Sequence, residues 1–193
     1  MEKKILTSTF FARPTVVVAQ ELLGKYLVRR MHGKEVAVMI TETEAYDGFE
    51  DTASHASKGK TPRTEVMFGT PGHWYVYLCY GVHEMLNVVT GPKGYPAAVL
   101  IRAVAETQTA KITKNLTSKN VMIYHNIFTG PGRVTKKLMI DRLLNTKQAS
   151  RANGLWIEDR GVTVSKNKIK KMPRVGVAYA GPYWAGKKWR FKI

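Results

Sequence analysis

Two side chains that could do chemistry together, the carboxylate of Glu44 and the ring of Tyr46, follow an apolar run at residues 36–40. That run is rich in β-branched residues, so we expect a buried strand over residues 36–43 that delivers both side chains from its end. A fixed carboxylate beside a fixed ring can activate water while a flat, conjugated substrate lies against the ring. Glu42 points to the same side by strand alternation, so spacing alone leaves the two glutamates as competitors.

A second aromatic cluster, rich in tyrosine, spans residues 73–81. Alternation along a strand places Tyr75 and Tyr77 on one face. Tyr80 breaks that alternation next to Gly81, which predicts a position at the exposed tip of a turn. Cys79 lies in an apolar run, and we expect its thiol to be buried and inert. Because it is the only cysteine, no disulfide can form within the chain.

The positive charge is concentrated in one half of the chain. The net charge is +17 over 193 residues, yet residues 1–106 hold 12 Lys and Arg against 11 Asp and Glu, whereas residues 107–193 hold 19 against 3. One interpretation is a solvated surface that maintains solubility. The other is a phosphate-binding face. Together with a carboxylate and aromatic rings, a phosphate-binding face indicates chemistry on a nucleobase.

The overall pattern predicts a single α+β domain over residues 1–193, with a mostly antiparallel, meandering sheet and few helices. Residues 47–72 form a long polar loop region in this prediction, and such loops are often functional. Residues 105–125 are polar and are predicted to be part helix and part loop. The other predicted elements are helices over 14–24 and 134–144, and strands over 26–30, 74–80, 85–89, 98–104, 162–164, 175–179 and 189–193.

Near matches to two cofactor motifs both fail. Residues 181–187 fit the start of a phosphate-binding loop, but Lys188 stands where Ser or Thr would bind magnesium. Residues 83–87 begin like a zinc-binding helix but end in Asn87, so the second histidine is missing. We therefore expect no metal and no cofactor.

The chain also lacks the signals of a membrane or secreted protein. No stretch reaches the roughly 18 apolar residues of a membrane span. The N-terminus lacks the apolar core of a signal peptide. We expect a cytoplasmic monomer, nucleoid-associated if bacterial.

Hydrolysis of an N-glycosidic bond would use residues of the types found here. The bond breaks through a sugar with oxocarbenium character, so a carboxylate must deprotonate water on the opposite face and stabilise the developing positive charge. A damaged base must leave the stack, so the pocket needs aromatic walls and the duplex needs a wedge. An alkylated purine is cationic and gains roughly 0.5–2 kcal/mol over an aromatic face. The residues that fit are Glu44, Tyr46, His55, Tyr77, Tyr80, Asn87 and Arg102.

Further short motifs surround these residues. They are Glu42-Thr-Glu44-Ala-Tyr46, Glu50-Asp51-x-x-x-His55, Thr61-Pro-Arg63, Met67-Phe68, Pro71-Gly72, Tyr75-Val-Tyr77-x-x-Tyr80-Gly81, Asn87, Leu100-x-Arg102-Ala103, Arg174-Val-Gly-Val-x-Tyr179-Ala-Gly181 and Trp189-Arg-Phe191. Their order and spacing resemble the alkyladenine (3-methyladenine) DNA glycosylases of the mammalian type, over most of the chain. The resemblance implies a curved, mostly antiparallel sheet with flanking helices and a protruding β-hairpin.

What the resemblance implies for activity is a monofunctional DNA-repair glycosylase. Its partner would be double-stranded DNA with damaged purines, among them 3-methyladenine, 7-methylguanine, hypoxanthine and ethenoadenine. Glu44 would be the general base for the attacking water, and Arg102 with the nearby main chain would position that water. The product would be an abasic site, and no cofactor is implied.

The resemblance also implies how the base is held. Tyr46 and His55 would stack on one side of the flipped base and Tyr77 on the other, and His55 could hydrogen-bond the base edge. Asn87 would stand where the exocyclic amino group of guanine projects, which would discourage excision of normal guanine. Tyr80 would enter the minor groove and fill the gap left by the flipped nucleotide.

One departure and several alternatives stand beside this interpretation. Mammalian members follow the wedge tyrosine with Gly-Met-Tyr, whereas this chain has Gly81-Val82-His83, so a smaller residue stands beside the wedge. Arg102 could be an ion-pair partner of Glu44, and Asn87 could bond backbone groups. Two other functions stay open: a non-catalytic nucleic-acid-binding module, and a bifunctional glycosylase/lyase that forms a Schiff base through a lysine.

Overall fold

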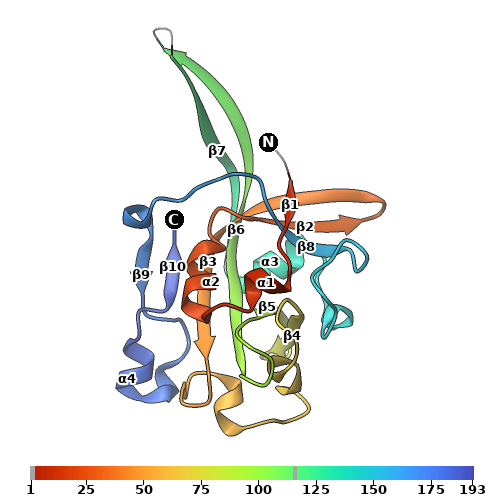
Figure 1. Ribbon diagram of the computed structural model, residues 1–193, viewed down its shortest axis with the longest axis vertical. Coiled ribbons are helices and arrows are strands. Elements are labelled where there is room, and N and C mark those ends of the chain that lie inside the picture. Colours follow the sequence, from red (N-terminus) through yellow and green to blue (C-terminus); the bar gives the residue numbers. More distant parts are fainter. Residues whose placement is uncertain (1–2, 115–116) are drawn as a thin grey trace.

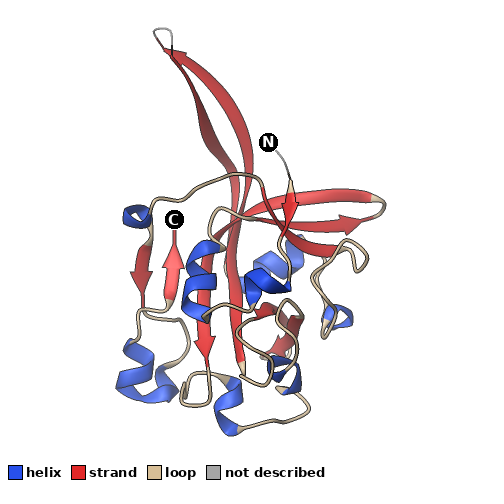
Figure 2. Ribbon diagram, viewed as in Figure 1, coloured by secondary structure: helices blue, strands red, loops and turns tan. Residues whose placement is uncertain are grey.

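A single curved sheet of antiparallel strands forms the centre of the molecule (Figures 1 and 2). The computed structural model describes residues 3–114 and 117–193. Within them the strand order is β1-β8-β2-β3-β6-β5-β4, with β7 added to β6, and β10 added to both β3 and β9. The strands are β1 Lys4–Ile5, β2 Tyr26–Met31, β3 Lys34–Asp47, β4 Trp74–Cys79, β5 His83–Val89, β6 Ala97–Lys114, β7 Thr117–Thr129, β8 Leu155–Asp159, β9 Lys170–Met172 and β10 Arg190–Lys192.

Short helices flank this sheet, and the predicted α+β class with a mostly antiparallel sheet is confirmed. The α-helices are α1 Ser8–Phe11, α2 Thr15–Glu21, α3 Pro131–Lys137 and α4 Gly181–Gly186. The 3-10 helices are η1 His55–Lys58, η2 Glu65–Phe68, η3 Arg142–Leu144, η4 Lys166–Lys168 and η5 Ala178–Ala180. In Figure 1, α1 and α2 lie over the sheet near β3 and β6.

The helix predicted over 14–24 is α2, which starts directly after Pro14. Val18 and Ala19 of α2 are fully buried against the sheet, in the main hydrophobic core. The hydroxyl of Thr43 donates a 2.7 Å hydrogen bond to the carbonyl of Ala19, which ties β3 to the helix. Gly24 follows at φ +84°, a left-handed conformation that glycine adopts readily and that ends the helical segment.

A β-bulge in β3 decides which way the two glutamates point. Val38 and Ile40 belong to the main core. Strand β3 shifts its register against β6 between Ile40 and Thr43. Beyond the shift, Thr43 and Ala45 take the core-facing side, because a slip of one residue exchanges the faces of a strand. Glu42, Glu44 and Tyr46 therefore lie on the face opposite the main core. The strand also runs on to Asp47, beyond the predicted end at Thr43.

The last strand of the chain lies directly beside the glutamates. In the antiparallel pairing of β10 with β3, Arg190 is opposite Glu44 and Lys192 is opposite Glu42. Strand β6 occupies the other edge of β3. The strand predicted over 189–193 is thus present, and it places cationic side chains next to buried carboxylates.

Strands β4 and β5 form a hairpin with Tyr80 at its tip. Cys79 pairs with His83, so residues 80–82 form the loop. Tyr80 at φ +50° and Gly81 at φ +71° both adopt the left-handed conformation that tight hairpin loops use. The side chain of Tyr80 is 90% exposed, as expected for a tip residue. Trp74 and Val76 point into the main core, which leaves Tyr75 and Tyr77 on the opposite face.

The prediction for residues 105–125 was wrong. Residues 105–114 continue β6, and 117–125 belong to β7, so the segment is a long hairpin that projects beyond the body of the molecule (Figure 1). Residues 115 and 116 lie outside the described residues. The segment is rich in β-branched Thr, Ile and Val, which favour strands, but it lacks the alternation of polar and apolar residues that a half-buried strand shows.

Three other predicted elements also differ. The helix predicted over 134–144 is shorter: α3 ends at Lys137, and a separate 3-10 helix, η3, follows. Residues 162–164 lie outside the strands, and the nearby strand is β8. Residues 175–179 form no strand because Gly176, at φ +76°, turns the chain away from an extended path. Cys79 is half-buried and not fully buried.

Candidate active site

One pocket of about 530 Å³ collects every residue that the sequence predicts for the site. It opens between β3, the β4–β5 hairpin, the 47–72 loop region and the segment 175–179. The predicted residues that line it are Glu44, Tyr46, His55, Tyr77, Tyr80, Asn87 and Arg102.

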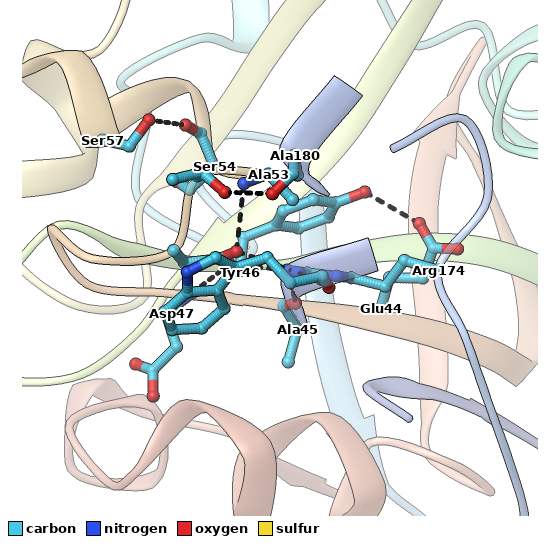
Figure 3. Close-up of polar contacts among 12 residues, drawn as sticks. Glu44, Ala45, Tyr46, Asp47, Ala53, Ser54, Ser57, Arg174 and Ala180 are labelled. Carbon is cyan, nitrogen blue, oxygen red and sulfur yellow. Dashed lines mark hydrogen bonds and ion pairs between the residues drawn. The ribbon is translucent and has the colours of Figure 1, made fainter. Parts of the chain in front are cut away.

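Glu44 is the buried carboxylate of this pocket, with a fully buried side chain that has a donor on each oxygen. Its Oε1 accepts a 2.9 Å hydrogen bond from the backbone N–H of Val175. Its Oε2 accepts one of 2.9 Å from the hydroxyl of Tyr46 (Figure 3). Nη1 of Arg102 lies 3.5 Å from Oε1. Burial raises the pKa of Glu44, and Arg102 and the two hydrogen bonds oppose that rise.

Glu42, the competitor on spacing, has a different environment. Its carboxylate is buried and contacts Nε of Arg102 at 3.1 Å, Nη1 of Arg190 at 3.4 Å and Nζ of Lys192 at 3.7 Å. It is not among the residues that line the pocket. Glu42 is therefore surrounded by cations away from the pocket, and Arg102 bridges the two glutamates.

Aromatic rings form the walls. The rings of His55 and Tyr77 meet edge to face at 4.8 Å, and those of Tyr75 and Tyr77 lie 5.1 Å apart. Nδ1 of His55 is 3.0 Å from the hydroxyl of Tyr75. Burial, with a smaller contribution from the Arg63 charge, lowers the pKa of His55 to about 4, so its imidazole is neutral at physiological pH.

Asn87 is buried at the pocket edge with its amide held in place. Its Nδ2 donates hydrogen bonds to the carbonyls of Tyr75 at 3.1 Å and Met85 at 3.4 Å. The backbone role considered for this residue is therefore present. These bonds fix the orientation of the amide, which a selective contact to a substrate would also require.

The tip of the β4–β5 hairpin stands beside a second, cationic hollow. Val82, next to the tip, is 71% exposed. A concavity of about 710 Å³ runs from Val82 and His83 to Arg133 and Lys136. Part of the basic C-terminal half therefore lies beside Tyr80.

Several residues of the site carried no assigned role in the sequence. Val175 contributes only a backbone N–H, for which a sequence holds no side-chain signal. Arg63 places its guanidinium 4.8 Å from the centre of the Tyr77 ring. The hydroxyl of Tyr179 donates to the carbonyl of Ala53 at 2.9 Å and so joins the segment 175–179 to the loop before His55. Arg63 and Tyr179 each lie in one of the short motifs named in the sequence, and that position is the only sequence feature that points to a role for them in the site.

Another hollow, of about 690 Å³, lies under α1 and α2. Its acidic side chains are paired with cations, Asp159 with Lys25 at 2.6 Å and Glu21 with Arg13 at 2.7 Å. It has no carboxylate beside aromatic walls. The pocket around Glu44 is therefore the better candidate for catalysis.

Two features are absent from the part of the chain that the structure describes. No group of three or more His, Cys, Asp and Glu side chains there is arranged to hold a metal ion. No helix there is long and apolar enough to cross a membrane.

The arrangement suits removal of a proton from water next to a flat group. Glu44 is buried, which raises its basicity, and its three donors favour the charged form that a base needs. The aromatic rings offer faces to a conjugated ring system, and a cationic ring would be favoured. The exposed tyrosine and the cationic hollow lie at the mouth, where a polyanion could approach.

Known proteins are similar to this chain over most of its length. A model of the methylpurine-DNA glycosylase family matches residues 9–193. A relative from Methanocella arvoryzae is 48% identical over 97% of this chain and 91% of its own length. Relatives from Psychrobacter cryohalolentis and Anaeromyxobacter dehalogenans are each 42% identical, over 92% and 97% of this chain and 86% and 83% of their own lengths. All three carry the name "Putative 3-methyladenine DNA glycosylase".

Proposed function

The chain belongs to the methylpurine-DNA glycosylase family of DNA-repair hydrolases, and on that premise we propose that it excises alkylated purines from duplex DNA by attack of a water that Glu44 activates. The observation that carries this proposal is the environment of Glu44. It is a fully buried carboxylate that lines an aromatic pocket, with donors from Tyr46, Val175 and Arg102.

The chemical step has a simple balance. The oxygen of water attacks C1′ of the sugar, Glu44 takes the proton, and the glycosidic electron pair leaves on the base nitrogen. Arg102, held between Glu42 and Glu44, positions the Glu44 carboxylate and keeps it charged. The products are a free base and an abasic site.

The leaving group determines which lesions react fastest. 3-Methyladenine and 7-methylguanine are cationic in DNA, so they depart as neutral bases without added protonation. Hypoxanthine and ethenoadenine are neutral and would need a proton. His55 is unprotonated at physiological pH because burial lowers its pKa to about 4, so it is a poor acid for that purpose. We expect cationic lesions to be excised fastest.

Binding of the base follows from the pocket walls. We expect the flipped purine to lie with Tyr46 and His55 on one side and Tyr77 on the other, where a cationic base gains from the ring faces. This arrangement requires the rings of His55 and Tyr77, which meet edge to face at 4.8 Å, to separate when the base enters. Asn87, with its amide fixed by two backbone carbonyls, excludes the amino group of guanine. Tyr80 fills the space that the base leaves in the duplex. Val82 is a small neighbour for this wedge, so Tyr80 carries most of that contact.

The bifunctional alternative requires a lysine at the sugar. No lysine lines the pocket within the described residues. A Schiff-base step therefore has no nucleophile in place, which supports hydrolysis as the reaction. The alternative of a binding module gives no role to the buried carboxylate of Glu44, which, unlike those of Glu42 and Glu158, lines the pocket.

The test is release of free base from duplex DNA that carries radiolabelled methyl purines. Wild-type protein should release 3-methyladenine, and Glu44→Gln should release none while it keeps its affinity for DNA. Glu158→Gln is the matched control, since it neutralises another buried carboxylate, paired with Arg160 and outside the pocket, and it should keep activity while folded. Borohydride should trap no covalent adduct. Absence of release by wild type, with salt-sensitive DNA binding, would leave a binding module.

A further inference from the structure

A buried ion pair joins two residues that lie 123 positions apart in the chain, Asp51 and Arg174. Both side chains are completely buried. Nη1 of Arg174 is 2.5 Å from Oδ2 of Asp51, and Nη2 is 2.8 Å from Oδ1, so the ion pair is bidentate. Burial of two charges is costly unless the geometry is good and other hydrogen bonds satisfy the groups. The remaining contacts of the pair show which segments it holds.

Asp51 anchors the start of the loop that carries His55. Its Oδ2 accepts from the backbone N–H of Asp47, and its Oδ1 accepts from that of Ala53, both at 3.2 Å. Asp47 is the last residue of β3, and Ala53 stands two residues before His55. The carboxylate thus fixes the path of the chain from the strand with Glu44 to the loop with His55.

Arg174 anchors β3 and the C-terminal segment. Nη1 donates to the carbonyl of Ala45 at 2.9 Å, and Nη2 donates to the carbonyl of Trp184 at 3.1 Å. Its guanidinium lies 4.9 Å from the ring centre of Tyr46. Ala45 stands between Glu44 and Tyr46 on β3, and Figure 3 shows the three residues with Arg174 beside them.

These contacts end next to the reacting groups. Val175 directly follows Arg174, and its N–H donates to Oε1 of Glu44 at 2.9 Å. The Arg174 side chain therefore holds the carbonyl of Ala45, next to Glu44. The residue after Arg174, Val175, supplies the N–H that bonds the Glu44 carboxylate. A pair that only stabilised the fold would have no need to join the pocket wall, the loop with His55 and the donor of Glu44 at one point.

We propose that Asp51 and Arg174 are the positioning pair of the glycosylase site, which sets the placement of the Glu44 carboxylate, the Tyr46 ring and the His55 loop relative to each other. This inference rests on the proposed function and adds two residues to it. Neither residue lines the pocket, so both act through the groups that they hold.

The experiment compares Asp51→Asn, Arg174→Lys and the double variant with wild type. Glu158→Gln is the matched control, because it neutralises another buried carboxylate, paired with Arg160 at 2.6 Å, that does not line the pocket. Base release is measured over a range of pH, at a temperature where thermal unfolding shows each protein folded. The carboxyl carbon of Glu44 is titrated by NMR in the same proteins without DNA.

We expect kcat to fall on the order of 100-fold in both single variants, since small displacements of reacting groups have effects of that size. The double variant should lose no more than the worse single variant, because the two residues act as a unit. Displacement of the Val175 donor should also raise the pKa of Glu44, so the acid limb of the pH profile should move to higher pH. Glu158→Gln should leave the pH profile unchanged.

The inference is overturned if folded Asp51→Asn and Arg174→Lys keep the wild-type kcat and pH profile, or if they lose activity only in proportion to the folded fraction. If Asp51→Asn does not fold, Arg174→Lys provides the test, because it keeps the positive charge and loses the bidentate contact. Its kcat and pH profile are then judged in the same way. If wild type releases no base, the proposed function fails instead. The Glu44 titration then decides on positioning: a raised pKa supports it, and an unchanged pKa overturns it.

Discussion

The hydroxyl of Tyr46 donates a 2.9 Å hydrogen bond to Oε2 of Glu44, two residues away on the same strand. The hydrogen bond therefore fixes the Tyr46 ring and the Glu44 carboxylate in position relative to each other. Burial together with this carboxylate raises the pKa of the Tyr46 hydroxyl well above its ordinary value, so the hydroxyl keeps its proton and remains a donor.

Tyr46→Phe should separate the two roles of this side chain. The variant keeps the ring for stacking and loses the donor to Glu44, so the pKa of Glu44 should rise and the acid limb of activity should move to higher pH. Hydrogen bonds to charged groups contribute about 1.5–3 kcal/mol, so we expect kcat at neutral pH to fall roughly tenfold or more. The measurement is a pH series of single-turnover base release. A large rise in KM with unchanged kcat would contradict the assignment.

Glu42→Gln should affect stability more than chemistry. The change leaves Arg102, Arg190 and Lys192 around a neutral group, and removal of one partner from a buried ion pair costs on the order of 3 kcal/mol. Chemical denaturation should show a lower free energy of unfolding, with base release retained below the transition. Activity lost as completely as in Glu44→Gln, in a folded protein, would make Glu42 the base.

His55 should stay neutral across the working range of pH. Its pKa is lowered from 6.5 to about 4 by burial and by Arg63, so its imidazole resonances should show no midpoint between pH 5 and 8. Because the unfolded chain binds this proton first as pH falls below 6.5, the free energy of unfolding should decrease from there towards pH 4. His55→Gln should remove that part of the decrease. A midpoint near 6.5 in the folded protein would refute the placement of the ring.

Tyr80→Ala should weaken binding without unfolding the protein. The side chain is 90% exposed, so thermal stability should change little. Stacking on a base contributes about 1–3 kcal/mol, so affinity for damaged duplex should fall by about 5- to 150-fold. Tyr183→Ala, another exposed tyrosine outside the pocket, is the matched control and should bind like wild type. Equal losses in both variants would argue against a wedge at the hairpin tip.

The sequence predicted the residues of the pocket better than the elements that carry them. Tyr75, Tyr77 and Tyr80 follow strand alternation and turn chemistry, both of which are local, so their placement could be predicted. The side of the sheet on which Glu44 lies depends on the bulge after Ile40. No residue in this stretch predicts that bulge, because a bulge arises from the pairing of two strands. Local sequence patterns can identify candidate side chains, whereas the register between strands determines on which face of the sheet those side chains lie.

Contacts between distant segments were beyond the reach of the sequence for the same reason. The donor that Val175 offers to Glu44 is a backbone group, and every residue except proline has one. Residues 175–179 have the apolar composition of a strand, yet Gly176 turns them towards the pocket. Residues 105–125 looked irregular because both faces of a projecting hairpin can be polar.

The order in which the chain is made has a consequence for this pocket. Glu44 leaves the ribosome 131 residues before Val175 and longer still before Arg190, its neighbour in β10. Contacts so far apart in sequence form late, after most of the chain is available. A nascent or prematurely terminated chain that stops before residue 174 has the carboxylate without its anchored donor and without the adjoining strand. The proposed reactive centre is therefore complete only after Val175 and strand β10 have been synthesised.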